Sequence, residues 1–193
     1  MVVIHICGAP ASGKTTLGNE LRKNKKIVVK DLDDVLAQYL RQIKRNKFTV
    51  DGYQKYLDGI IGSPSKKPVV LVGINGDMGR SSTTYRLNAD HKFFIDLDVK
   101  ENAKRRFVRD YKNDVEHFFM WQYNGKPNTL QIYNEWTKNE NQSTHRLQEV
   151  IKDMSPAGLE KDTMRWRARY KKLGYVLKSK EKILDAVKRL CRI

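Results

Sequence analysis

The stretch GAPASGKT, residues 8–15, matches the phosphate-loop spacing G-x-x-x-x-G-K-[ST] at every fixed position. The apolar run before it, residues 2–7, is typical of a short buried strand. Behind it, Leu17 and Leu21 lie four residues apart, which indicates a helix. A strand, a glycine loop and a helix in this order aim backbone N–H groups and a helix N-terminus at bound phosphate. The alternative is a glycine turn that carries a lysine by chance.

In such a loop each residue type has a distinct task. We expect the Lys14 ammonium to reach the outer phosphates of a polyphosphate and the Thr15 hydroxyl to bind Mg²⁺. The residues expected to hold the phosphates are Gly8, Ala11, Ser12, Gly13, Lys14, Thr15 and Thr16.

The composition favours partners that carry phosphate. The chain has 193 residues, 38 Lys and Arg against 22 Asp and Glu, and a formal net charge of +16. A nucleotide or a nucleic acid would suit this charge, and a solvated basic surface is the alternative. The length fits a single domain with its own core.

Cysteine usage and hydropathy exclude several classes of protein. Cys7 and Cys191 form no disulfide framework, and no apolar run approaches the length of a membrane span. We expect no targeting segment before the first strand. We therefore expect a soluble protein of the cytoplasm.

Short apolar strands alternate with helical patterns along most of the chain. Further strands are predicted at residues 27–30, 69–74, 92–97 and 175–178, and Ser179 is expected to cap a final helix. This alternation predicts an α/β fold with a parallel sheet covered on both faces. Between residues 111 and 172 it stops, and we expect a helical insertion there.

Polar and charged residues follow each predicted strand. They are Asp31 and Asp33 after the second strand, residues 75–80 after the third, and a basic helix after the fourth. Ligands of open α/β sheets bind at the carboxyl ends of the strands, where these residues meet. Positioning groups together with positive charge are what phosphoryl transfer requires.

The order of these motifs resembles the small P-loop kinases of the nucleoside and nucleotide kinase superfamily, including the adenylate, shikimate and gluconate kinases. The resemblance covers roughly residues 1–112 and 170–193. It implies the three-layer P-loop NTPase fold with strand order 2-3-1-4-5, an acceptor-binding helical segment at about 32–66 and a lid-like helical insertion at about 111–172. ATP and Mg²⁺ are the cofactors it implies.

The resemblance also implies roles for residues outside the phosphate loop. The stretch VVKDLDDV is similar to the D-x-D element of these kinases, with Asp33 as the acceptor-side carboxylate and Asp31 near the metal. Arg105 and Arg109 match their R-x-x-x-R pair, the first against the adenine and the second reaching the phosphates. The expected acceptor-binding residues are Asp31, Asp33, Arg41 and Arg80. The stretch NGDMGR departs from the Asp-Gly-aromatic-Pro-Arg element of nucleotide kinases, which leaves the register of Arg80 open.

These features predict an ATP-dependent kinase whose acceptor is a nucleoside or nucleotide, with Lys14, Asp33, Arg105 and Arg109 as its catalytic residues. A polynucleotide 5′-kinase and a kinase of another small hydroxyl compound remain alternatives. A different class is a P-loop ATPase or nucleic-acid-binding protein, for which residues 93–96 could form a Walker-B-like strand.

The stretch MRWRARYKK, residues 164–172, interleaves cations with aromatic residues. This pattern could stack nucleic-acid bases. The other interpretation, which we favour, is an amphipathic helix with Met164, Trp166 or Tyr170 partly buried and the long cations reaching water.

Overall fold

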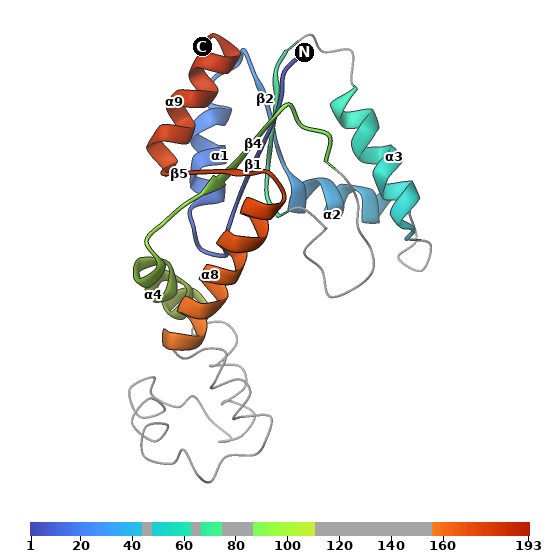
Figure 1. The fold of residues 1–193 in the computed structure, drawn as a ribbon. Coiled ribbons are helices and arrows are strands. Elements are labelled where there is room, and N and C mark those ends of the chain that lie inside the picture. The colour runs from blue at the N-terminus through green and yellow to red at the C-terminus, as the bar shows by residue number, and fades with distance from the viewer. Residues whose placement is uncertain (44–47, 63–66, 75–86, 111–155) are drawn as a thin grey trace. The chain divides into compact units, whose positions relative to one another are not determined.

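The computed structural model describes residues 1–43, 48–62, 67–74, 87–110 and 156–193 (Figure 1). Contacts divide the chain into two compact units, residues 1–97 with 167–193, and residues 98–166. The predicted acceptor-binding segment is described except for residues 44–47 and 63–66. Of the predicted insertion, residues 111–155 lie outside the described part, while residues 156–172 are helical.

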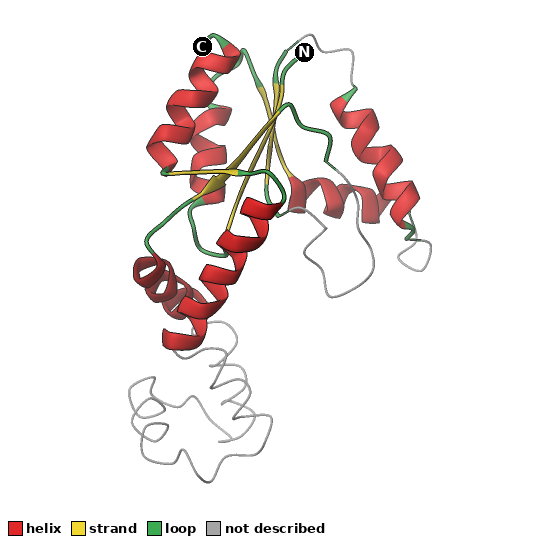
Figure 2. Ribbon diagram, viewed as in Figure 1, coloured by secondary structure: helices red, strands yellow, loops and turns green. Residues whose placement is uncertain are grey.

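A five-stranded sheet with the order β2-β3-β1-β4-β5 forms the centre of the larger unit (Figures 1 and 2). All four strand pairs are parallel, which confirms the predicted α/β class and strand order. Each strand begins and ends within two residues of its predicted bounds. The strands are β1 (Val3–Gly8), β2 (Val28–Asp31), β3 (Val69–Val72), β4 (His91–Ile95) and β5 (Val176–Lys178).

Six helices occur in the described ranges, and their labels follow Figure 1. They are α1 (Lys14–Arg22), α2 (Leu32–Gln42), α3 (Val50–Ile61), α4 (Val99–Asp110), α8 (Pro156–Lys172) and α9 (Lys180–Cys191). None of the helices that the structure describes has the length and apolar content needed to cross a membrane.

Helices α1 and α9 cover one face of the sheet, on the left in Figure 1. Leu17 and Leu21 of α1 and Ile183 of α9 are buried there against Ile4 and Ile6 of β1. The four-residue spacing of the two leucines places both on the buried side of α1, as the sequence predicts.

Helices α2 and α3 cover the opposite face, which completes three layers. Leu32 and Val35 of α2 and Tyr53 of α3 are buried with Val69 and Leu71 of β3. Val70 and Val72 of the same strand are buried on the other face, with α1 and α9. All four residues of β3 are thus buried, as expected for a central parallel strand.

Short polar side chains begin three of the helices. Asp31 caps α2 and Thr49 caps α3, each accepting a hydrogen bond from a first-turn amide. Ser179 Oγ accepts from the Lys182 amide at 3.4 Å, which confirms the predicted cap of α9. Asp31 is thus both the last residue of β2 and the N-cap of α2, so no loop residue separates the strand from the helix.

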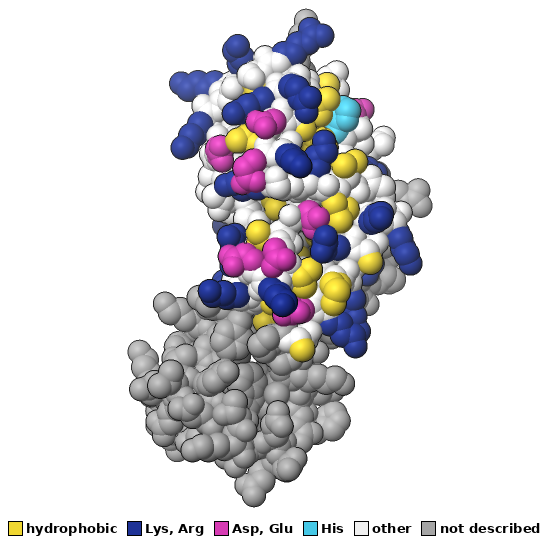
Figure 3. All heavy atoms as spheres, turned by 60° about the vertical axis from the view of Figure 1, so that its left-hand side comes forward, with side chains coloured by type: hydrophobic (Ala, Val, Ile, Leu, Met, Phe, Trp, Pro, Cys, Tyr) yellow, Lys and Arg dark blue, Asp and Glu magenta, His cyan; other side chains and the backbone are white. Residues whose placement is uncertain are grey.

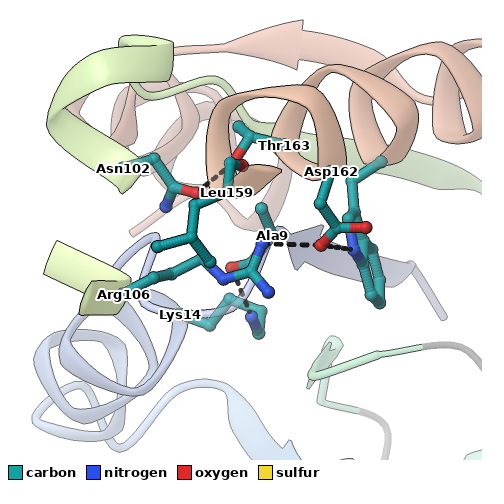
Figure 4. A network of polar contacts seen from close by, with 8 residues as sticks. Ala9, Lys14, Asn102, Arg106, Leu159, Asp162 and Thr163 are labelled. Atoms are coloured by element: carbon teal, nitrogen blue, oxygen red, sulfur yellow. Dashed lines mark hydrogen bonds and ion pairs between the residues drawn. The ribbon is translucent and has the colours of Figure 1, made fainter. Parts of the chain in front are cut away.

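The smaller unit contains α4 and the first part of α8. Buried Thr163 of α8 donates a hydrogen bond to Asn102 Oδ1 of α4 at 2.8 Å, and its hydroxyl also contacts the Leu159 carbonyl oxygen at 2.9 Å (Figure 4). Arg106 of α4 pairs with Asp162 of α8 at 2.6 Å. These contacts hold α4 against α8 within this unit.

Candidate functional site

The predicted phosphate loop joins β1 to α1 through a sharply turned backbone. Ala11 has a φ of 60°, and Gly13, which precedes the first residue of α1, has a φ of 94° and a ψ of 19°. The Ser12 amide closes a turn on the Ala9 carbonyl oxygen at 3.1 Å. The backbone conformation at position 13 favours glycine. An added Cβ would meet nothing within 4 Å, but a residue with a side chain rarely adopts this left-handed φ.

Helix α1 begins with its amide groups directed toward this loop. Its first i to i−4 bond runs from the Leu17 amide to the Gly13 carbonyl oxygen at 3.0 Å. The N–H groups that precede this bond have no acceptor inside the helix, and they carry the positive end of its dipole. The loop and the helix start together can therefore receive a phosphate group.

The Lys14 ammonium lies back across the loop. Its Nζ donates hydrogen bonds to the carbonyl oxygens of Gly8 at 2.8 Å and Ala9 at 2.9 Å. Figure 4 shows the contact with Ala9. A hydrogen bond between two charged groups is stronger than one to a neutral carbonyl. An anion in the loop would therefore compete well for this ammonium.

Gly8 and Ser12 are packed against each other under the loop. A Cβ on Gly8 would collide with Ser12 Oγ and would approach Ile95 Cβ to 3.2 Å. Ser12 is 3% exposed, and within the described residues its Oγ has no hydrogen-bond partner. A buried hydroxyl without a partner is costly, so the loop fits a ligand that brings hydrogen-bonding oxygens.

The two predicted aspartates lie where β2 enters α2. Asp31 is half-buried and its Oδ1 accepts a hydrogen bond from the Asp33 amide at 3.0 Å, whereas the Asp33 side chain is exposed. Asp34, the next residue, forms an exposed ion pair with Arg22 at 3.6 Å. Asp31 thus carries out the capping task, and Asp33 presents its carboxylate to solvent.

Burial is the main cause that raises the pKa of Asp31 above its ordinary value. The hydrogen bond from the Asp33 amide lowers this pKa, the charges of Asp33 and Asp34 raise it, and Arg22 lowers it. The hydrogen bond and the nearby Arg22 therefore do not fully offset the cost of burying the Asp31 carboxylate in its ionised form, and a bound cation would stabilise that form.

The sheet register relates these aspartates to the phosphate loop. Asp31 of β2 lies opposite Val72 of β3, and Val72 lies opposite Ile6 of β1. Two strand spacings of about 4.8 Å thus separate Asp31 from Ile6, roughly 10 Å. The structure brings the phosphate loop, Asp31 and Asp33 to the same carboxyl edge of the sheet.

An ion pair that the sequence did not predict lies at the same edge and involves Asp96, the last residue of the possible Walker-B-like strand. Asp96 follows β4, whose Ile95 lies opposite Gly8 of the loop. Arg167 of α8 forms an ion pair with the Asp96 carboxylate. Its Nε lies 2.7 Å from Oδ1, and its Nη2 donates a hydrogen bond to Oδ2 at 3.0 Å. Seventy-one positions separate the two residues, so no local pattern could predict the pair.

The predicted arginines lie in different parts of the chain. Arg41 is exposed in the last turn of α2, and Arg80 lies outside the described residues. Arg105 and Arg109 are exposed on α4, which belongs to the smaller unit, and Arg105 pairs with Glu101 at 2.7 Å. Between them, half-buried Arg106 pairs with Asp162, which also accepts from Trp166 Nε1 at 3.1 Å.

Comparison of the chain with protein-family models and with curated proteins found no match.

Proposed function

We propose that this chain is an ATP-dependent phosphotransferase that moves the γ-phosphoryl group to a nucleoside or nucleotide. The observation that carries the proposal is the Lys14 ammonium lying on the Gly8 and Ala9 carbonyl oxygens, at the start of α1 and beside β1. A basic chain with a net charge of +16 suits phosphorylated substrates.

Residues 8–16 would bind the phosphates of ATP. The amides at the start of α1 and the Lys14 ammonium supply positive charge, and the orphaned Ser12 hydroxyl gains a partner. Arg167, fixed by Asp96 beside the loop, is a further cation in position to stabilise phosphate charge. Arg105 and Arg109 keep the roles that the resemblance implies, as do Arg41 and Arg80 on the acceptor side.

Thr15 and Asp31 would hold Mg²⁺. The exposed Thr15 hydroxyl and a half-buried carboxylate of raised pKa are oxygen donors of the kind that Mg²⁺ combines with substrate phosphates and water. The ion supplies neutralisation of phosphate charge.

Asp33 would act on the acceptor. Its carboxylate is exposed at the edge of the sheet, where it can accept a hydrogen bond from an acceptor hydroxyl and take its proton. A bond then forms between the acceptor oxygen and the γ-phosphorus, the bond to the bridging oxygen breaks, and ADP leaves. A polynucleotide 5′-end or another small hydroxyl compound would meet the same carboxylate.

The pairing of Asp96 disfavours the simple ATPase alternative. A Walker-B carboxylate must be available to the metal, whereas both oxygens of Asp96 lie against Arg167. A D-x-D turn also has no evident task in an ATPase.

Transfer of label from ATP tests the proposal directly. The protein is incubated with γ-labelled ATP, Mg²⁺ and a panel of nucleosides, nucleotides, 5′-hydroxyl oligonucleotides and small hydroxy acids. We expect label on a nucleoside or nucleotide. Label released only as free phosphate, or no turnover with any acceptor, contradicts the proposal.

Two variants with matched controls assign the roles. Lys14→Met should abolish transfer, while Lys26→Met, which removes an exposed cation outside the loop, should retain it. Asp33→Asn should abolish transfer but keep ATP binding in calorimetry. Its control is Asp185→Asn, which removes an exposed carboxylate of α9, outside the predicted acceptor-binding segment, and should leave transfer unchanged.

A further inference from the structure

Helix α8 has a buried line of side chains along one face. Leu159, Thr163 and Tyr170 are at most 2% exposed, and Trp166 is half-buried. These four residues follow the spacing i, i+4, i+7, i+11 of a single helix face. Tyr170 packs on Phe94 of β4, with ring centroids 5.2 Å apart.

The opposite face repeats this spacing with exposed residues. Lys161, Arg165, Ala168 and Lys172 occupy the same i, i+4, i+7, i+11 positions, displaced by two residues. We call the three exposed cations Lys161, Arg165 and Lys172 the cationic line. At 1.5 Å per residue it extends over about 16 Å of the helix. Exposed Lys171 and Arg169 flank it.

Acidic side chains are absent from this exposed face of α8. Glu160 and Asp162 are half-buried at its sides, and Asp162 is engaged with Arg106 and Trp166. The helix dipole favours cations in the last turn and so accounts for Lys171 and Lys172. It gives no reason for Lys161 and Arg165, which lie near the middle of the helix.

The burial of the aromatic residues decides what this face can recognise. Tyr170 is fully buried, and Trp166 is half-buried with its Nε1 bound to Asp162, so neither offers an open ring to a nucleic-acid base. The cations can still contact phosphates, which run along a strand at regular intervals. Met164, 52% exposed, is the one large apolar side chain here, too little for a helix that inserts into lipid.

We propose that the cationic line of α8 binds the phosphate backbone of a nucleic-acid strand without reading its bases. This interaction goes beyond the proposed phosphotransfer, and its test uses no transfer assay. Basic side chains project from much of the face in Figure 3, with acidic ones among them. The test must therefore separate the line from the charge of the whole chain.

The test compares two triple variants of equal charge. Lys161→Glu/Arg165→Glu/Lys172→Glu removes the cationic line, and Lys182→Glu/Lys188→Glu/Arg189→Glu changes three exposed cations of α9. Each replacement changes the charge by two units, so each variant moves from +16 to +10. Circular dichroism and thermal unfolding check that both are folded. If charge reversal prevents folding, Lys161→Gln/Arg165→Gln/Lys172→Gln is compared with Lys182→Gln/Lys188→Gln/Arg189→Gln, which has the same net charge.

Binding is measured by fluorescence anisotropy with labelled oligothymidylate, oligodeoxyadenylate and oligouridylate of about 20 nucleotides, between about 50 and 200 mM salt. We expect binding by the unmodified chain with similar affinity for the three probes. The α8 variant should lose about tenfold or more at low salt, and its salt slope should be shallower by about 2, from three lost contacts at about 0.7 each. The α9 variant should lose less than about threefold, because its cations lie outside the line.

Four results would overturn the proposal. They are no binding to any probe, equal losses in the two variants, a preference for one base that exceeds about tenfold, and an affinity that does not change with salt. Vesicles that contain phosphatidylserine are the remaining probe. Binding to vesicles but not to oligonucleotides would assign the surface to membranes instead.

Discussion

His5 Nε2 and the Gly73 carbonyl oxygen lie 3.1 Å apart in the interior of the sheet. Because a carbonyl oxygen only accepts, Nε2 must carry the proton, and Nδ1 therefore accepts from the Tyr175 hydroxyl at 2.5 Å. His5 is fully buried, and this burial is the main cause that lowers its pKa to about 4. The hydrogen bond to Gly73 raises that pKa and the charge of Lys92 lowers it.

The pKa of His5 predicts a loss of stability in mild acid. In the unfolded chain the imidazole takes up a proton near pH 6.5, whereas in the fold it does so only near pH 4. The neutral imidazole thus supports the fold above pH 6.5, and its contribution of about 3 kcal/mol is lost as the pH falls toward 4. Urea unfolding of the unmodified chain and of His5→Gln at pH 7.5 and 4.5 measures it. Equal pH dependence in the two proteins would contradict the assignment.

Ser12→Ala should change stability and ligand binding in opposite directions. Removing the orphaned hydroxyl should stabilise the free protein by about 1 kcal/mol, because no hydrogen bond is lost. Calorimetry should show weaker ATP binding, since the hydroxyl is no longer there to meet the ligand. The control is Thr163→Val, which removes a buried hydroxyl that has partners and should destabilise. A destabilised Ser12→Ala would mean that the hydroxyl has a partner.

Gly13→Ala and Gly59→Ala separate backbone strain from crowding. An added Cβ meets nothing within 4 Å at either position, but only Gly13 has a left-handed φ, 94°. Gly13→Ala should cost about 1–2 kcal/mol and weaken ATP binding. Gly59→Ala, in α3, should stabilise by about 0.5–1 kcal/mol. Thermal unfolding measures both, and equal effects of the two substitutions would refute the strain argument.

The Asp96–Arg167 pair should couple more strongly than an exposed pair. In a double-mutant cycle with Asp96→Asn and Arg167→Gln, we expect a coupling energy of about 1 kcal/mol, because Asp96 Oδ2 accepts a hydrogen bond from Arg167, Oδ1 lies 2.7 Å from its Nε, and the contact is part-buried. The cycle on Glu101 and Arg105, which are exposed, should give about 0.3–0.5 kcal/mol. Urea unfolding supplies both values. Coupling of equal size would show that Asp96 does not hold Arg167 in place.

Local sequence patterns predicted the sheet and the start of α1 because their signals lie within a few residues. Apolar runs gave the strands, and residues 8–15 placed the turn between β1 and α1. The same reasoning allowed an aspartate cap at this junction, with Asp34 as its candidate, whereas in the structure the carboxylate of Asp31 caps α2. Capping geometry depends on where the helix begins, and helix boundaries are the weakest part of such patterns.

Contacts between distant parts of the chain escaped prediction. His5 interrupts an apolar run like any polar residue, and its partner Tyr175 lies 170 positions away. Arg167 stands among other cations of α8, and only the return of the chain to β4 brings it to Asp96. Pairings of this kind are set by topology, on which a local window of sequence has no bearing.

The hydrogen bonds of the Lys14 ammonium to the Gly8 and Ala9 carbonyl oxygens affect how strongly an anion would bind in this loop. Two carbonyl dipoles already satisfy the ammonium, so an incoming anion gains only the difference between its own attraction and theirs. Chloride offers a single diffuse charge and gains little, whereas a polyphosphate tail brings several charges that also meet the amides of α1. In the proposed function, this difference would favour ATP over the common salts of the medium.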